Sequence, residues 1–271
     1  MSNFIPPNSL SLDVKPKQQR RIAIQGFSGV GKTTSAITAR NPVVLDIDNS
    51  VDEINCRAAG KNLNEVIVVP FYSRAFLDTV KPRTNIRDAF IKWLEDNINK
   101  FSEEQTLVLD SWSRLQDSFD QQTTLEPVIS KRGEVDAFAF WALKQQYSRD
   151  VLSIIRTAKC DVIVIMHEIQ ETDDNGKPTG KVMPLMSGKF VNKLGSYFTD
   201  FYRQIAIDKE CTEALATKLG LTIQQLKSYC DSCKTNTLRL WQIESSSIAN
   251  CKSKLLDMPR FIPANCSVFY K

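Results

Sequence analysis

Short apolar runs alternate along this chain with longer segments in which apolar residues recur every three or four positions. The runs are rich in β-branched residues, as is typical of strands buried on both faces: RIAIQ (21–25), PVVLDID (42–48), EVIVVPF (65–71), TLVLDSW (106–112) and CDVIVIMHE (160–168). Helical patterns occupy residues 31–40, 85–101 and 137–159 between them. This alternation predicts an α/β fold with a mainly parallel central sheet flanked by helices.

The last third of the chain has a different pattern. Residues 198–208 and 237–245 predict two more strands, paired antiparallel. The segment between them, 209–234, predicts two short helices with a break at Gly220. We therefore expect a small helical insertion near the C-terminus, at the edge of the sheet.

The first strand leads into QGFSGVGKTT (25–34), in which Gly26, Gly31, Lys32 and Thr33 occupy the constant positions of the P-loop pattern G-x-x-x-x-G-K-[ST]. The glycines let backbone N–H groups turn toward phosphates, and the following helix adds its positive N-terminal end. The motif predicts ATP bound through Lys32 and Mg²⁺ held by the Thr33 hydroxyl. The residues expected to contact the nucleotide are Gly26, Ser28, Gly29, Val30, Gly31, Lys32, Thr33 and Thr34.

Polar residues end three other predicted strands, at the edge where ligands of parallel sheets bind. Asp110 is placed to hold Mg²⁺ through water, and Asp48 to activate the water that attacks ATP. Asp46 shares a face with Asp48 if the strand continues that far. His167, the single histidine of the chain, is a candidate contact of the γ-phosphate, with Glu168 as the competing polar residue. The alternatives are a solvated acid at Asp48 and a structural role for His167.

The order of these elements resembles the RecA-like ATPase core over residues 18–207. It is similar to small phage-encoded, AAA-type recombination ATPases, which are described as phage nucleotide-binding proteins and associated with single-strand annealing. The resemblance implies that Asp48 takes the place of the acid, usually glutamate, that activates water. It also implies that Asp110 and Ser111 end the Walker B strand and that His167 is the γ-phosphate sensor.

In RecA-like recombinases a DNA-contacting loop follows the sensor, and residues 172–189 take that place here. Lys177, Lys181 and Lys189 in this segment, and Arg203 beyond it, are candidates for contact with DNA phosphates or with the ATP of a neighbouring subunit. The glycines and prolines of the segment are also typical of an ordinary exposed hairpin. Few aromatic residues accompany the lysines, so the segment does not encode base stacking.

These patterns divide the chain into four parts: a flexible N-terminal arm (1–18), the RecA-like ATPase core (19–207), the helical insertion (208–235) and a final strand with a C-terminal packing segment (236–271). The insertion has the order of a DNA-binding helix-turn-helix, in which an apolar helix, a glycine turn and a second helix follow one another. The alternative is an ordinary helix pair. Cys230 and Cys233 of the insertion form a CxxC pair, for which we consider free buried thiols or a zinc site.

Composition narrows the picture further. The 271 residues carry a net charge of +4, which permits nucleic-acid binding without arguing for it. Seven cysteines, an odd number, fit reduced thiols better than a disulfide framework. No apolar run approaches the roughly 18 residues of a membrane span, and the first residues lack the layout of a signal peptide. We expect a cytoplasmic protein without a membrane partner, in an infected host cell if it is phage-encoded.

Together these features predict an ATPase that acts in phage-type DNA recombination or single-strand annealing. We expect a homo-oligomer on single-stranded DNA, with a single-strand-binding protein as a further partner. One alternative is a small-molecule nucleotide kinase, but such enzymes use an arginine-rich lid and no arginine lies between His167 and Arg203. Another is a nucleotide-switched scaffold or loader, which commonly carries a second signature lysine where this chain has Phe27.

Overall fold

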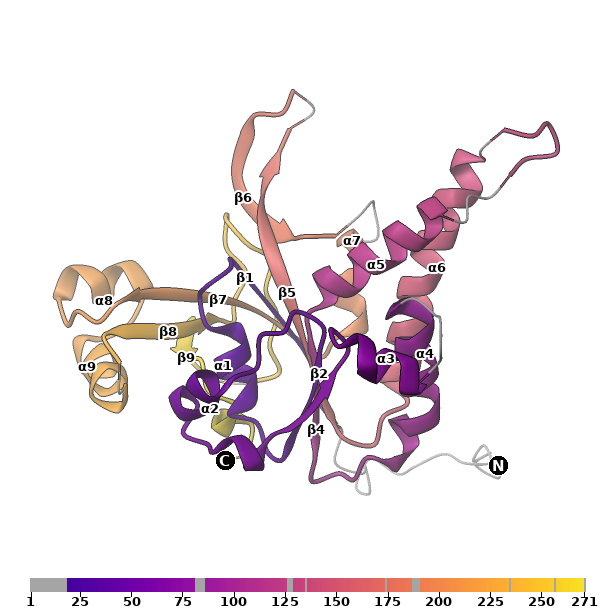
Figure 1. Ribbon diagram of the computed structural model, residues 1–271. Coiled ribbons are helices and arrows are strands. Elements are labelled where there is room, and N and C mark those ends of the chain that lie inside the picture. Colours follow the sequence, from indigo (N-terminus) through magenta and orange to yellow (C-terminus); the bar gives the residue numbers. More distant parts are fainter. Residues whose placement is uncertain are drawn as a thin grey trace, which may run out of the picture.

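A nine-stranded sheet forms the centre of the described part of the chain, with helices on both of its faces (Figure 1). The computed structural model describes residues 19–80, 86–125, 129–134, 136–173, 175–186, 191–233, 235–255 and 257–270. The expected N-terminal arm (1–18) and Lys189 therefore lie outside the described residues.

Parallel pairing dominates the sheet. The strands are β1 (Arg21–Gly26), β2 (Pro42–Asp46), β3 (Ile67–Pro70), β4 (Thr106–Asp110), β5 (Asp161–Thr172), β6 (Pro178–Pro184), β7 (Asp200–Asp208), β8 (Thr237–Gln242) and β9 (Phe261–Pro263). Their order is β3-β2-β4-β5-β1-β7-β8-β9, and β6 pairs with β5 outside this row. The strands from β3 to β7 in that order are parallel, whereas β6, β8 and β9 join antiparallel. The predicted α/β core with a mainly parallel central sheet is confirmed, as is the antiparallel pairing of β7 with β8.

Helices follow most of the strands. They are α1 (Lys32–Ile37), α2 (Glu53–Ala58), α3 (Arg74–Val80), α4 (Ile86–Asn97), α5 (Trp112–Leu125), α6 (Ala137–Arg156), α7 (Val191–Leu194), α8 (Glu213–Leu219) and α9 (Ile223–Ser232). The sequence pattern did not predict α2 or α3, which are too short to show a helical period, or α5. β4 ends at Asp110, the residue at which the sequence predicted the end of the strand, and Trp112 begins α5. No helix among the described residues has the length and apolar character needed to cross a bilayer.

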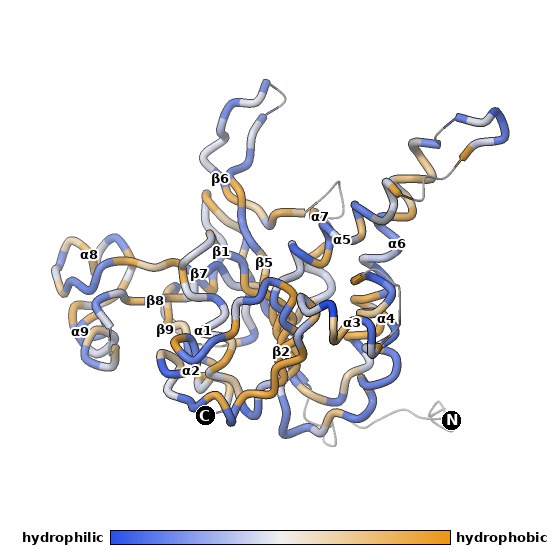
Figure 2. The backbone as a smooth tube through the Cα atoms, in the orientation of Figure 1, coloured by the Kyte–Doolittle hydropathy of each residue, from blue (hydrophilic) through white to orange (hydrophobic). Residues whose placement is uncertain are grey.

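Two hydrophobic cores lie on the two faces of the sheet. On β1, Ile22 and Ile24 point into one core and Ala23 into the other, because successive side chains of a strand alternate. The core around Ala23 packs under α4, α5 and α6, and the core around Ile22 packs under α1, α2 and the C-terminal segment. Figure 2 shows hydrophobic strands gathered in the body and hydrophilic residues at the tip of the β5–β6 hairpin. β1 is thus covered on both faces and provides a rigid start for the loop that follows it.

The predicted helical insertion is present between β7 and β8. Thr212 caps α8 by accepting a hydrogen bond from the N–H of Leu215, and Thr222 caps α9 in a capping box with Gln225. Gly220 between them has φ +65°, the left-handed conformation that ends a helix. A third core cluster packs both helices against β8. Whether these helices read DNA stays a prediction.

Cys230 and Cys233 lie at the end of α9. Cys230 is buried in the third core cluster, and the Cys233 thiol lies 3.3 Å from the carbonyl oxygen of Thr237. Within the described ranges, no group of three or more His, Cys, Asp or Glu side chains is arranged to hold a metal. Both cysteines are free thiols, and the zinc alternative therefore finds no ligand set in the described part of the chain.

β5 runs further than the sequence pattern predicted, as far as Thr172. β6 returns antiparallel to it, and the two strands form a hairpin that projects from the body of the molecule (Figure 1). The Asp173 carboxylate closes the turn by accepting a hydrogen bond from the backbone N–H of Lys177 (2.8 Å). The described part of the candidate DNA loop is therefore an ordered hairpin that exposes Lys177 and Lys181.

A buried ion pair joins β5 and β7, the two strands that flank β1 in the sheet. The Arg203 guanidinium donates to Glu168 from Nε (3.1 Å to Oε2) and from Nη2 (2.9 Å to Oε1). The side chains of Arg203 and Glu168 are 14% and 0% exposed. Arg203, a candidate for contact with DNA phosphates or with a neighbouring subunit's ATP, is therefore paired and largely buried within its own chain, and its part in such contacts stays a prediction.

Breaking this pair should destabilise the fold. The substitution Glu168→Gln leaves the Arg203 guanidinium buried without its counter-charge, so we expect a loss of about 3–5 kcal/mol in the free energy of unfolding. The matched control is Asp78→Asn, which breaks the exposed Arg74–Asp78 pair and should cost below about 1 kcal/mol. Urea denaturation of both variants measures the difference, and equal losses would contradict the structural role of Glu168.

Candidate functional site

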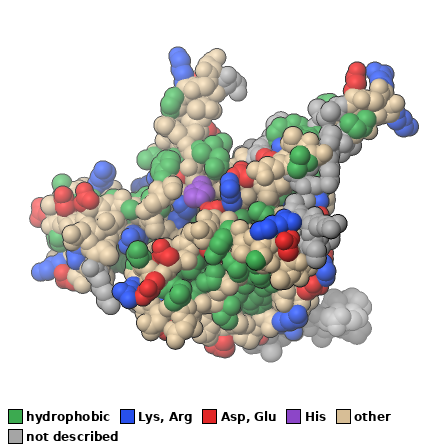
Figure 3. Space-filling model, viewed as in Figure 1, with side chains coloured by type: hydrophobic (Ala, Val, Ile, Leu, Met, Phe, Trp, Pro, Cys, Tyr) green, Lys and Arg blue, Asp and Glu red, His purple; other side chains and the backbone are tan. Residues whose placement is uncertain are grey.

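The carboxyl ends of β1, β2, β4 and β5 border a cavity of about 610 Å³. The residues that line it are Ser28, Gly29, Gly31, Lys32, Thr33, Thr34, Asp48, Ser50, Asn55, Asp110, Arg114, His167 and Arg239. In Figure 3 the histidine lies near the foot of the β5–β6 hairpin, with basic side chains nearby. The cavity thus brings together the phosphate-loop motif and the three strand-end residues that the sequence singled out.

Backbone conformation requires glycine at positions 29 and 31, and packing requires it at positions 26 and 31. Gly29 and Gly31 have φ of +81° and +84°, a region that side chains with a Cβ rarely adopt. A Cβ on Gly31 would lie 2.7 Å from Cδ of Arg239, and a Cβ on Gly26 would lie 2.8 Å from the carbonyl oxygen of Gln204. The loop therefore turns tightly because it rests directly on β7 and β8.

Gln204 supports the loop from behind. Its Nε2 donates to the Val30 carbonyl (2.8 Å), and its Oε1 accepts from Nε1 of Trp241 (3.0 Å). The side chain is buried, so both ends of the carboxamide are used in a site shielded from water. Among the predicted nucleotide contacts, Gly26 and Val30 are absent from the cavity lining, and they join the loop to β7 instead.

Lys32 folds over the loop. Its ammonium donates to the carbonyl oxygens of Gly26 and Phe27, each at 2.8 Å. Burial lowers the pKa of Lys32 to about 8, although the carboxylates of Asp110, Glu168 and Asp48 act in the opposite direction. An anion in the cavity would favour the charged ammonium, because an opposite charge nearby stabilises the charged form.

Three side-chain oxygens converge beside Lys32. The hydroxyls of Thr33 and Ser50 both donate to Oδ2 of Asp110, at 2.6 and 2.7 Å. Burial raises the pKa of Asp110 to about 6, with the two hydroxyl hydrogen bonds acting against this shift. Two hydroxyls and a carboxylate are the hard oxygen donors that suit Mg²⁺. The donor set therefore fits the expected metal, and Thr33 and Asp110 lie together as predicted.

Asp46 and Asp48 have different environments, because β2 ends at Asp46. The Asp46 carboxylate is fully buried and accepts hydrogen bonds from the backbone N–H groups of Ser50 (3.0 Å) and Val51 (3.2 Å). Burial raises the pKa of Asp46. Through these hydrogen bonds Asp46 shapes the turn that places Ser50 beside Asp110. Asp48 lies within the same turn and lines the cavity. The expected shared strand face does not form.

Asp48 and His167 form a pair on the cavity wall. Nε2 of His167 lies 3.2 Å from Oδ2 of Asp48, and the side chains are 30% and 20% exposed. Burial acts to raise the pKa of Asp48, but hydrogen bonds with His167 and Ser111 outweigh it, and the pKa is lowered overall. Asp48 is thus ionised at neutral pH. Of the two competing residues on β5, His167 lines the cavity and Glu168 pairs with Arg203.

Sequence reasoning missed four residues of the cavity: Ser50, Asn55, Arg114 and Arg239. The Asn55 side chain accepts a hydrogen bond from the Thr34 hydroxyl (2.8 Å) and so braces the first turn of α1. Nε of Arg239 is buried and has no hydrogen-bond partner among the described residues. Its only sequence signal is a charge within the apolar strand TLRLWQ (237–242). An unpartnered guanidinium N–H beside the loop suits a phosphate oxygen.

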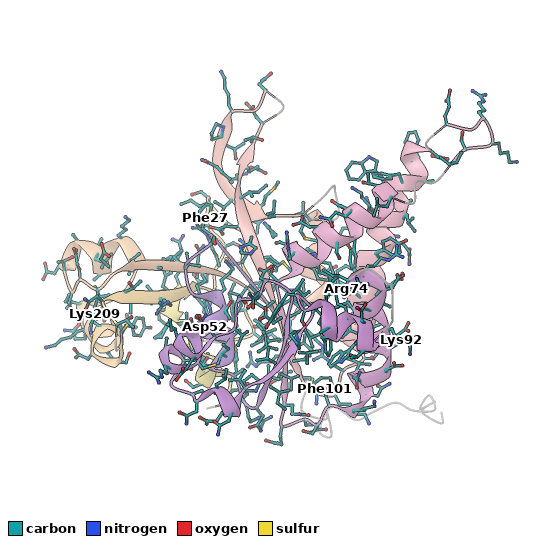
Figure 4. All side chains as sticks on the ribbon, in the orientation of Figure 1. Phe27, Asp52, Arg74, Lys92, Phe101 and Lys209 are labelled. Atoms are coloured by element: carbon teal, nitrogen blue, oxygen red, sulfur yellow. The ribbon has the colours of Figure 1, made fainter. Side chains whose placement is uncertain are left out.

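The predicted DNA or trans-acting lysines lie apart from this cavity. Lys177 and Lys181 are on the hairpin and do not line it. Phe27, labelled in Figure 4, lies close to the foot of the hairpin and is 44% exposed. β5 links the cavity to the hairpin, because it carries His167 at the cavity and then continues into the hairpin.

Comparison with known proteins gives one family match. Residues 18–218 match the family described as AAA domain. The structure is similar to the crystal structure of the RadB recombinase (TM-score 0.44, 13% identity, 90% of this chain and 86% of that chain). It is also similar to an ATPase from the type III secretion system of pathogenic bacteria (TM-score 0.37, 14% identity, 73% of this chain and 54% of that chain). No curated protein sequence matches significantly.

The two left-handed glycines allow a direct comparison. A Cβ added at Gly31 would overlap the Arg239 side chain, whereas a Cβ at Gly29 would meet nothing within 4 Å. Both substitutions to alanine carry the cost of a positive φ, about 1–2 kcal/mol. We therefore expect Gly31→Ala to weaken ATP binding at least about tenfold more than Gly29→Ala does. Calorimetric titration with Mg²⁺ and ATP measures the affinities, and equal losses would contradict the packing argument.

Proposed function

This chain belongs to the AAA domain family, and from that premise we propose that it binds and hydrolyses ATP in the cavity around Lys32. One observation carries the proposal. Gly29, Gly31, Lys32 and Arg239 line the same cavity that Thr33, Ser50 and Asp110 border with oxygens. Cationic and N–H groups for a triphosphate and oxygen ligands for Mg²⁺ therefore lie side by side.

We assign the hydrolytic step to Asp48 and His167. In ATP hydrolysis a water oxygen bonds to the γ-phosphorus, the bond to the β,γ-bridging oxygen breaks, and ADP leaves with that electron pair. Asp48, ionised and open to the cavity, is the carboxylate placed to orient this water and accept its proton. His167 holds Asp48 through the 3.2 Å contact and is the candidate sensor of the γ-phosphate. Thr33, Ser50 and Asp110 would hold Mg²⁺, which when bound would neutralise charge on the phosphates.

We further propose that single-stranded DNA, in phage-type recombination or annealing, controls this ATPase, and that the protein works as a homo-oligomer. The support is the continuity of β5, which runs from the cavity wall at His167 into a projecting hairpin with exposed Lys177 and Lys181. Lysines on such a hairpin can neutralise DNA phosphates. A DNA strand bound to these lysines would affect the ATP cavity through β5, which reaches both the hairpin and the cavity wall. The division of the chain into an arm, a core, an insertion and a C-terminal segment belongs to the same proposal.

The substitution Lys32→Ala should reduce ATP turnover by about a hundredfold or more, because it removes the cation that stabilises charge on the phosphates. The control Lys92→Ala removes an exposed ammonium that pairs with Asp96 on α4, and its turnover should match the wild type. Release of inorganic phosphate at saturating ATP and Mg²⁺ measures both. Undiminished hydrolysis in Lys32→Ala would refute the site.

The substitution Asp48→Asn keeps the size of the side chain but removes the proton acceptor, so the turnover rate should fall about 10²–10⁴-fold. ATP affinity should stay within a fewfold of the wild type, because Asp48 does not supply phosphate-binding N–H groups. Stopped assays of kcat, together with equilibrium binding of ATP, separate the two effects. The control Asp52→Asn changes an exposed helix cap nearby. A loss of affinity with normal kcat would remove Asp48 from the water-activating role.

Single-stranded DNA should accelerate hydrolysis by the wild type at low salt, and ATP with an oligonucleotide should shift the mass of the protein to higher oligomers. Mass photometry together with the hydrolysis rate measures both effects. A monomer that ignores DNA but phosphorylates nucleoside monophosphates would point to the kinase alternative.

A further inference from the structure

A second cavity, of about 440 Å³, lies beneath the β5–β6 hairpin. Its lining comes from β1 (Gln25), β5 (Glu171), β6 (Lys181–Pro184), the segment that holds Val191 and Gly195, β7 (Phe201) and the segment 246–252 that follows β8. Phe201 belongs to the same core as Ala23, and Gln25 follows Ala23 by two positions on β1. Since side chains two apart on a strand share a face, Gln25 points to the face opposite Ile22 and α1.

Gln25 has an unmet hydrogen-bonding requirement. Its side chain is only 1% exposed, and Oε1 has no hydrogen-bond partner among the described residues. A buried unpaired carboxamide oxygen is costly, and native proteins pair most such groups. Because Gln25 borders the cavity, a ligand with a hydrogen-bond donor could complete its bonding.

The cavity is built of fixed elements. The segment 246–252 is held to β6 by the hydrogen bond from Val182 N–H to the Ile248 carbonyl (2.8 Å). At its other end Lys252 and Phe201 exchange a pair of backbone hydrogen bonds, of 2.9 and 2.8 Å. This strap therefore closes one side of the cavity and ties the hairpin to β7.

The lining combines several kinds of contact. Val182, Met183 and Phe201 supply apolar surface, and Lys181 and Lys252 supply exposed ammonium groups. The Glu171 carboxylate also borders the cavity and accepts a hydrogen bond from the Thr179 hydroxyl (2.6 Å). The Gln25 carboxamide offers a hydrogen-bond acceptor and a donor in one plane. Glutamine pairs with base edges, apolar side chains pack on bases, and lysine ammonium groups contact phosphates. This combination fits one nucleotide unit with its base directed inward.

We propose that this cavity takes one nucleotide of single-stranded DNA, with the base on Gln25 and the phosphates on Lys181 and Lys252. The proposal rests on the DNA-controlled ATPase proposed above and assigns the strand a place. Gln25 directly precedes Gly26, the first constant glycine of the phosphate loop. Gly26 packs on Gln204, which also bonds Val30 of the loop. A base bound to Gln25 is therefore one peptide unit from the ATP-binding loop.

Photo-crosslinking tests the location in the wild-type protein. An oligonucleotide that carries 4-thiothymidine, bound in the presence of Mg²⁺ and ATP, should crosslink to peptides that contain residues 181–184 or 246–252. Crosslinks confined to the hairpin turn or to α8 and α9 would overturn the proposal. Free 4-thiothymidine monophosphate at the same nucleotide concentration should label these peptides poorly, and equal labelling would indicate a free-nucleotide pocket and overturn strand binding.

The substitution Gln25→Leu tests the recognition. It keeps the volume but removes the carboxamide, so we expect oligonucleotide affinity, measured by fluorescence anisotropy, to fall about tenfold. The melting temperature should be unchanged or higher, because an unpaired buried oxygen is removed. A purely structural glutamine would instead lower the melting temperature and leave affinity intact, which would overturn the proposal.

A lysine pair tests the phosphate contacts. The variant Lys181→Ala with Lys252→Ala should bind more weakly and reduce the dependence of log affinity on log salt by about 1–2, since about two phosphate contacts are lost. The matched control Lys227→Ala, at an exposed lysine on α9, should leave the slope unchanged. A wild-type slope in the double variant would overturn the proposal.

Two failures can be told apart. If the wild type hydrolyses ATP, binds the oligonucleotide and is stimulated by it, but any one of the three tests gives its contradicting result, only this cavity assignment is wrong. If the wild type neither binds the oligonucleotide nor responds to it, DNA control and the cavity assignment both fall. Hydrolysis without DNA, and its loss in Lys32→Ala, then still decide the ATPase assignment.

Discussion

The candidate site depends on a loop whose tight turns are held by contacts from behind. Gly29 and Gly31 adopt left-handed conformations, and the loop they form rests on Gln204 and Arg239. Gln204 connects the loop to Trp241 through its carboxamide. These supporting residues come from β7 and β8, so the part of the sheet beyond β1 helps to form the candidate phosphate site. The loop would lose its support if β7 and β8 shifted.

Burial gives the site its electrostatic character. It lowers the pKa of Lys32 to about 8 and raises that of Asp110 to about 6. In both residues desolvation disfavours the charged form. A triphosphate beside Lys32 and a cation beside Asp110 would each favour the charged form, so ligand binding and charge state are thermodynamically linked. The site is thus suited to respond to the presence of a nucleotide with its metal ion.

The alternation of side chains along two strands places different functions on the two faces of the sheet. On β5, His167 lines the nucleotide cavity, and Glu168 pairs with Arg203 on the other side. On β1, Gln25 borders the second cavity, and the next residue, Gly26, begins the phosphate loop. Both cavities border β5, one at His167 and the other at Glu171, so the proposed ATP site and the proposed DNA site share that strand.

The sequence by itself determined the parallel sheet, the phosphate loop and the edge at which Asp48, Asp110 and His167 meet. These features follow from local periodicity and from a motif of adjacent residues, which a chain displays without knowledge of its fold. Only the tertiary structure decided that Arg203 pairs with Glu168 and that Arg239 reaches the loop. Such contacts join residues far apart in sequence, and they depend on strand order and register, which apolar periodicity does not specify.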